Sequence, residues 1–191
     1  LNSMVKYFLS LLVLLSIIAC NSKLSNNEKE VFTAKGKDIA KATFNELSSN
    51  LMEQMKLGGP SQAIPFCNVQ AMPITEQLSE TYNVIIKRTS NKLRNSSNEP
   101  TERELEIINE FSNALQNKLD LKPVVEIDNQ NSKHFYAPII MQANCLACHG
   151  KLNEMVTIQT DSIIKLLYPN DKAMGYVEGD LRGIWSITFK N

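Results

Sequence analysis

The sequence predicts an α+β domain in which helices precede an antiparallel sheet. Apolar residues recur at helical spacing through much of the first half of the chain, whereas the second half contains short segments with strand-like patterns. No internal repeat or low-complexity segment interrupts this order. Helices followed by antiparallel strands, with further helices between the strands, are characteristic of α+β proteins.

The first expected element is a long amphipathic helix from Glu28 to about Met55. Its apolar residues mostly recur every three, four or seven positions, and the run Gly58-Gly59-Pro60 is expected to end it. The apolar stripe should pack on the chain's own domain, because the strict heptad of a coiled coil is absent. A second helix is expected to open at Pro73, which places Cys67 in a turn between two helical pieces.

The remainder of the chain carries alternating strand and helix signals. A short strand at 84–86 leads into a polar loop at 91–100, after which Thr101 and Glu104 have the spacing of a capping box that starts a helix. The later expected elements are a strand at 124–127, a strand at 134–141, a helix at 161–168 and a strand at 184–189 with Trp185, Ile187 and Phe189 on one face.

The amino-terminal segment is typical of a secretory signal. An apolar run from Tyr7 to Ile18 is too short to span a bilayer, and it ends at Ala19-Cys20 in a pattern similar to a bacterial lipobox. We therefore expect a signal peptide at 1–19, a lipid-anchored tether at 20–27 that starts with lipidated Cys20, and one folded domain at 28–191. The protein would then be a membrane-anchored lipoprotein on the periplasmic or outer-surface side.

The charge of the chain is balanced, with 20 Lys and Arg residues against 20 Asp and Glu residues. Because no block of basic residues occurs, nucleic acid is not an expected partner. The expected partners are the membrane, through the lipid on Cys20, and a redox or signalling protein.

The most specific motif of the chain is Cys145-Leu146-Ala147-Cys148-His149, which has the C-x-x-C-H pattern of c-type haem attachment. Two thiols on one helical turn can each bond a haem vinyl group, while the adjacent imidazole reaches one axial face of the iron. The alternatives are half a zinc site and a redox dithiol. A zinc site normally needs a second Cys/His pair at short spacing, whereas Cys67 and His134 lie far apart, and the βαβ pattern around a redox dithiol is not seen. We predict one covalently attached haem c.

Several residues could bind the opposite face of the iron. If Cys20 is acylated and the motif cysteines hold the haem, Cys67 is left without a partner in an oxidising compartment, and such a thiol is usually buried or used. A single methionine is more often a core residue. The candidates that composition leaves open are Cys67, His134, Met141, Met155 and Met174.

Four sequence motifs of the chain occur together in one known family. They are Ala63-Ile64-x-x-Cys67-x-x-x-Ala71, Arg88 to Asn95, Cys145 to Gly150, and Tyr168-Pro169-x-Asp171-x-Ala173-x-Gly175-Tyr176 with Gly179 to Gly183. Over about residues 30–190 the chain resembles a family of single-haem c-type cytochrome domains. The resemblance implies a PAS-like fold, an antiparallel sheet flanked by helices, and an iron held by His149 and Cys67.

The implied ligand pair has functional consequences. A thiolate stabilises ferric iron, and two filled axial positions leave no open site, so a haem enzyme such as a peroxidase is not expected. We expect redox or small-ligand sensing, in which a small gas could bind only if Cys67 dissociates; a periplasmic electron-transfer cytochrome is the alternative. Arg88, Arg94 and Arg182 are candidate contacts of the haem propionates, because guanidinium groups match carboxylates in geometry and charge.

Overall fold

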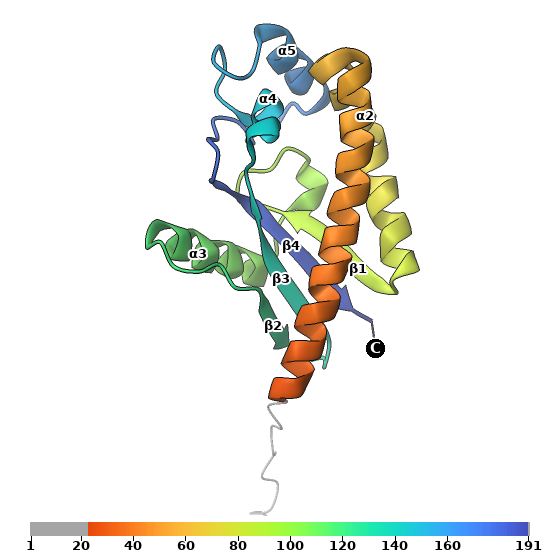
Figure 1. Ribbon diagram of the computed structural model, residues 1–191, viewed down its shortest axis with the longest axis vertical. Coiled ribbons are helices and arrows are strands. Elements are labelled where there is room, and N and C mark those ends of the chain that lie inside the picture. The colour runs from red at the N-terminus through yellow and green to blue at the C-terminus, as the bar shows by residue number, and fades with distance from the viewer. Residues whose placement is uncertain (1–22, 191) are drawn as a thin grey trace, which may run out of the picture.

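The computed structural model describes residues 23–190 and confirms the α+β architecture (Figure 1). A long amino-terminal helix and shorter helices flank a four-stranded antiparallel sheet. The expected signal peptide and Cys20 lie outside the described residues. Among residues 23–190 no helix is both long and apolar enough to cross a membrane.

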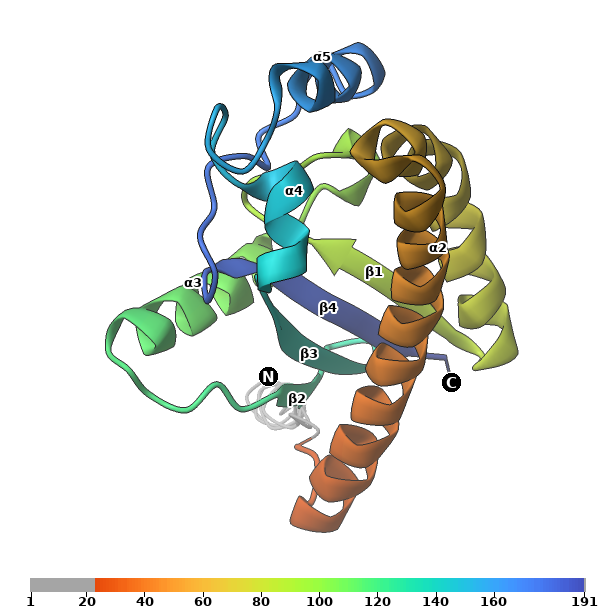
Figure 2. The same cartoon turned by 45° about the horizontal axis from the view of Figure 1, so that its top comes forward.

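Helix α2 (Asn26–Thr81) is a hairpin, and its first arm is interrupted at Gly58 and Gly59, in the run that the sequence predicts to end the first helix. It begins at a capping box, in which the Ser25 hydroxyl accepts a hydrogen bond from the Glu28 backbone and the Glu28 carboxylate accepts one from the Ser25 backbone. The backbone leaves the helical conformation only at Gly58 and at Gly59, whose φ of 63° favours glycine. The chain then reverses, so that residues 26–57 and 60–81 form two arms that lie side by side (Figures 1 and 2).

The second arm corrects two expectations. Cys67 lies inside this arm and not in a turn, and Pro73 lies within the arm instead of opening a new helix. Proline normally disfavours a helix interior, since it lacks an N–H group and clashes with the preceding turn. Here the arm buries Ala63, Ile64 and Thr75, and this tertiary packing outweighs the local penalty.

The sheet has the strand order β1-β4-β3-β2, with every neighbouring pair antiparallel. Its strands are β1 (Val84–Thr89), β2 (Val124–Ile127), β3 (Lys133–Ile140) and β4 (Leu181–Phe189). The strand β2 has the bounds that the sequence predicts, whereas β1 and β4 are each three residues longer than expected. The additional residues of β1 pair with β4, for example Arg88 with Trp185.

Three further helices complete the fold. They are α3 (Glu102–Gln116), α4 (Leu146–His149) and α5 (Ile158–Leu167), with single 3-10 turns at Ser96–Asn98 and Ala143–Cys145. The expected capping box of α3 is confirmed: the Thr101 hydroxyl accepts from the Glu104 backbone at 3.2 Å, and the Glu104 carboxylate accepts from the Thr101 backbone at 2.8 Å. Figure 2 shows α4 above the end of β3, facing the α2 hairpin.

Helices cover both faces of the sheet. Along β4, Trp185, Ile187 and Phe189 share one face, as the alternating pattern predicts, and they join the core that α2 covers. Ile184 points to the opposite face and joins the core with Ile107, Ile108 and Phe111 of α3. A third, smaller cluster lies under α4 and contains Met141, Leu146, Ala173 and Tyr176.

Candidate functional site

A cavity of about 580 Å³ lies between the α2 hairpin, the sheet and α4. This volume is within the range of pockets that hold cofactors. The first arm of α2 contributes one wall and the second arm contributes another, while the floor comes from β1, β3 and β4. The apolar residues that line it include Phe44, Leu47, Leu51, Met52, Met55, Ala63, Ile64, Met72, Leu93, Ile139, Met141, Met155 and Trp185.

The C-x-x-C-H motif opens onto this cavity. Cys145 ends a 3-10 turn, and Cys148 and His149 lie on the single turn of α4, so all three side chains line the same space. Burial raises the pKa of the Cys148 thiol against the lowering effect of Arg94, and the thiols of Cys67 and Cys145 raise it further. Neither motif cysteine is in a disulfide, as both thiols are free.

The His149 imidazole is fixed by a hydrogen bond from Nδ1 to the Ala173 carbonyl at 2.7 Å. Because a carbonyl only accepts, Nδ1 carries the proton and the lone pair of the neutral ring is on Nε2. Burial holds the pKa of His149 well below its usual range, and the charges of Arg94, Arg182 and Lys92 lower it further against the bond to Ala173. A neutral imidazole oriented in this way is suited to binding a metal through Nε2.

Cys67 reaches the same cavity from the second arm of α2. Its thiol is free, and it is near enough to the motif to raise the pKa of Cys148. Burial raises the pKa of Cys67 itself, while Arg88 and Arg94 lower it. The structure therefore brings Cys67 of α2 together with three residues far from it in the sequence: Cys145, Cys148 and His149.

The other candidates for the second axial position are separated by the structure. Met141 and Met155 line the cavity, whereas His134 and Met174 are not among its lining residues. The His134 ring contacts the Thr188 hydroxyl and the Asp128 carboxylate, each at 3.0 Å, near the start of β3. The Met174 sulfur lies 3.4 Å from the Arg94 guanidinium.

Arg88, Arg94 and Arg182, the three arginines singled out in the sequence, all line the cavity, but their surroundings differ. Within residues 23–190, Arg88 and Arg182 have no ion-pair partner; Arg88 stacks over the Trp185 ring at 6.0 Å, and Arg182 donates to the Lys92 carbonyl at 3.1 Å. Burial lowers the pKa of both guanidinium groups. Half-buried cations without a carboxylate partner are suited to an anionic ligand.

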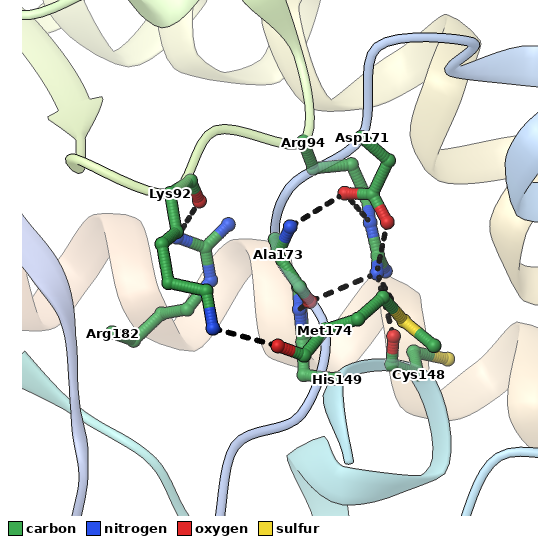
Figure 3. Close-up of polar contacts among 8 residues, drawn as sticks. All are labelled: Lys92, Arg94, Cys148, His149, Asp171, Ala173, Met174 and Arg182. Atoms are coloured by element: carbon green, nitrogen blue, oxygen red, sulfur yellow. Dashed lines mark hydrogen bonds and ion pairs between the residues drawn. The ribbon is translucent and has the colours of Figure 1, made fainter. Parts of the chain in front are cut away.

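Arg94 is instead engaged by the protein. It forms an ion pair with Asp171 at 3.2 Å, and its Nη2 donates to the Cys148 carbonyl at 2.6 Å and to the Ala173 carbonyl at 3.2 Å (Figure 3). These bonds connect the loop at residues 90–95 to the motif and to the segment after α5. Unlike the other two arginines, Arg94 therefore has a carboxylate partner among residues 23–190.

A model of the Tll0287-like family matches residues 14–190. The chain belongs to the Tll0287-like family. This match confirms the family resemblance drawn from the sequence motifs. No curated protein matches the chain.

A solved structure with the same fold is described as the crystal structure of the cyanobacterial heme-protein Tll0287. It is 23% identical to this Tll0287-like chain, the TM-score is 0.56, and the match covers 80% of this chain and 92% of the other. At this identity, the likeness is one of fold.

The sequence did not predict that the first arm of α2 lines the cavity of this Tll0287-like chain. Its apolar stripe was expected to pack on the domain, yet Phe44 and Met52 line the cavity and are 42% and 41% exposed. Helical spacing identifies an apolar face but cannot distinguish a face that packs on protein from one that lines a cavity. The role of Asp171 as partner of Arg94 was also missed, although both residues belong to the quoted family motifs.

Proposed function

We propose that this chain binds one haem c covalently through Cys145 and Cys148, with His149 and Cys67 as the axial ligands of the iron. The observation that carries the proposal is the convergence of these four side chains on one apolar cavity. Membership of the Tll0287-like family and a fold shared with a protein described as a heme-protein support it.

The residues of the cavity fit the group in three respects. The volume of about 580 Å³ and the apolar walls suit a large planar ligand. The Nδ1–H of His149 is bound to a carbonyl, which leaves Nε2 to coordinate. Arg88 and Arg182 provide positive charge for the propionates. When bound, haem supplies one-electron redox chemistry.

The Cys67 thiol gives the site its proposed use in redox or small-ligand sensing. A thiolate ligand would favour ferric iron, and with both Cys67 and His149 bound no coordination position would be left for catalysis. A small gas would therefore bind only after Cys67 dissociates. The chain is proposed to act outside the cytoplasm as a lipoprotein anchored at Cys20, with a redox or signalling protein as its partner.

Spectroscopy of the mature protein, produced with c-type haem maturation, tests the ligand assignment. We expect a low-spin ferric EPR signal typical of thiolate ligation, which Cys67→Ser abolishes. The matched control is Met155→Leu, which removes another sulfur from the cavity lining and should leave the signal unchanged. If Cys67→Ser leaves the spectrum unchanged, or Met155→Leu alters the ligand signature, the assignment is wrong.

Three further measurements test the remaining parts of the proposal. Haem that leaves the polypeptide in acid acetone would contradict thioether attachment. Exposure of the reduced protein to CO should replace Cys67 and change the spectrum if the site is a sensor. A spectrum that keeps both ligands under these conditions would contradict sensing and favour electron transfer.

Metabolic labelling with palmitate should mark the full-length protein, and Cys20→Ala should lose the label.

A further inference from the structure

The segment 171–176, named here the strap, lies directly against the haem-attachment motif. The Gly175 backbone donates to the Gly150 carbonyl at 3.0 Å, and the Tyr176 backbone donates to the His149 carbonyl at 3.0 Å. The His149 imidazole donates back to the Ala173 carbonyl of the strap. The position of the imidazole is therefore set by the position of the strap.

Arg94 and Asp171 hold the strap in place. The Asp171 carboxylate accepts from the Ala173 backbone at 2.9 Å and pairs with the Arg94 guanidinium, and the side chains of the pair are only 13% and 5% exposed. Two nearby bonds tie the loop at residues 90–95 to the strap. Lys92 Nζ donates to the Met174 carbonyl at 2.7 Å (Figure 3). The Lys172 backbone donates to the Leu93 carbonyl at 2.7 Å.

The Ala173 carbonyl is the point where the pair meets the imidazole. This oxygen accepts from His149 Nδ1 at 2.7 Å and from Arg94 Nη2 at 3.2 Å. A cationic donor on the same oxygen draws electron density from it and weakens its bond to the imidazole. An imidazole that is less strongly polarised at Nδ1 donates less electron density through Nε2.

We propose that the Arg94–Asp171 pair is a positioning element that fixes the orientation of the His149 imidazole through the Ala173 carbonyl and sets how strongly the ring donates to iron. The inference rests on the proposed function, because it takes His149 as an axial ligand. It assigns Arg94 a role towards the histidine ligand in place of one towards a propionate.

The sign of the effect follows from the charges. Arg94→Gln removes the cation from the Ala173 carbonyl, so the imidazole donates more and ferric iron is favoured. Asp171→Asn keeps a side-chain oxygen that can accept from the Ala173 backbone and from Arg94. It removes the negative charge that offsets the Arg94 guanidinium, so the cation weakens donation by the imidazole further and ferrous iron is favoured. The two variants of one ion pair should therefore shift the reduction potential in opposite directions.

The test is redox titration and EPR of the haem-loaded full chain. Arg94→Gln should lower the potential, and Asp171→Asn should raise it, each by at least the 59 mV that corresponds to a tenfold change in the ferric-to-ferrous ratio. Arg94→Lys keeps the charge without the planar fork, so it should alter the EPR g-values, which report ring orientation, more than the potential. The control is Arg103→Gln, which breaks surface ion pairs with Glu106, Glu110 and Glu126 on the far face of the sheet and should change neither quantity.

Shifts of the same sign in Arg94→Gln and Asp171→Asn would indicate general loosening and overturn the proposal, as would potentials equal to that of the wild type. If Arg94→Gln does not fold, as judged by circular dichroism, Asp171→Asn and Arg94→Lys still decide the matter. Failure of the proposed function gives a different result, because the wild type would then lack covalent haem or histidine ligation.

Discussion

Gly36 is the point at which the first arm of α2 approaches the sheet most closely. Its Cα faces the Phe135 ring of β3, and an added Cβ would overlap three atoms of that ring, the farthest of them at 2.7 Å. Phe135 is 0% exposed and lies in the core with Ile39, Ala40 and Trp185. The ring is therefore enclosed by other core side chains and cannot turn out into solvent.

The substitution Gly36→Ala should destabilise the protein, although alanine is the better helix former. The gain in helix propensity is about 1 kcal/mol, whereas overpacking a core costs about 1–3 kcal/mol and sometimes more. Because the obstacle is a fully buried ring, the upper part of that range applies, and we expect a net loss of about 2 kcal/mol. For a domain of this size, this loss corresponds to a fall in Tm of about 4–8 °C.

Urea unfolding followed by circular dichroism measures the effect. Lys37→Ala, at the exposed neighbouring position, is the control for propensity alone and should leave the midpoint within error or raise it slightly. Phe135→Leu in the Gly36→Ala background should recover part of the loss relative to the sum of the two single variants. A Gly36→Ala protein as stable as the wild type would refute the packing argument.

Two other predictions concern the sheet. Burial acts to raise the pKa of Glu104, but hydrogen bonds from Lys87 at 2.7 Å and from Thr101 and Ser186 outweigh it, so the pKa is lowered on folding. The stabilisation by ionised Glu104 is present above its unfolded pKa of about 4.3 and is lost as the pH falls through the lower folded pKa. Lys87→Met should therefore lower the unfolding free energy by about 1–3 kcal/mol at pH 7 and by progressively less on acidification. Equal losses at pH 7 and pH 3 in urea titrations would contradict this prediction. The second prediction concerns Gly183→Ala, in which the new Cβ would meet the Thr89 carbonyl where β1 pairs with β4. This clash should lower the unfolding free energy by about 1–3 kcal/mol, as measured by thermal unfolding. An unchanged Tm would exclude the close contact.

Local signals in the sequence are sufficient for several elements of the fold. The capping box at Thr101 and Glu104 determines where α3 begins, and alternation determines which residues of β4 face α2. The extension of β1 to Thr89 is different, because it depends on pairing with a strand almost one hundred positions later. Local patterns contain no information about such pairing.

The candidate site likewise contains residues that a local motif predicts and residues whose position depends on the tertiary fold. Cys145, Cys148 and His149 form a contiguous motif whose spacing suffices to predict their shared position. Cys67 was favoured by its lack of a partner thiol and by the family resemblance, but its place in a helix was not predicted, because nearby prolines favour a break when packing is unknown. The cavity itself depends on how the α2 hairpin folds against the sheet, which the sequence pattern does not contain.

The α2 hairpin also has a mechanical consequence. Its first arm is held on the sheet by Phe32, which contacts Phe189, and its second arm is held near its end by the Ser79 hydroxyl, which accepts from the Ile86 backbone at 3.0 Å. Within α2 the backbone is non-helical only at Gly58 and Gly59, so any change in the angle between the two arms would be centred on this junction. Cys67 lies eight residues beyond Gly59, about 12 Å along the second arm. A change of about 5° in the angle between the arms would therefore move it by about 1 Å. If Cys67 binds the iron as proposed, a displacement of this size, small for a helix, would be large compared with the tolerance of a coordination bond.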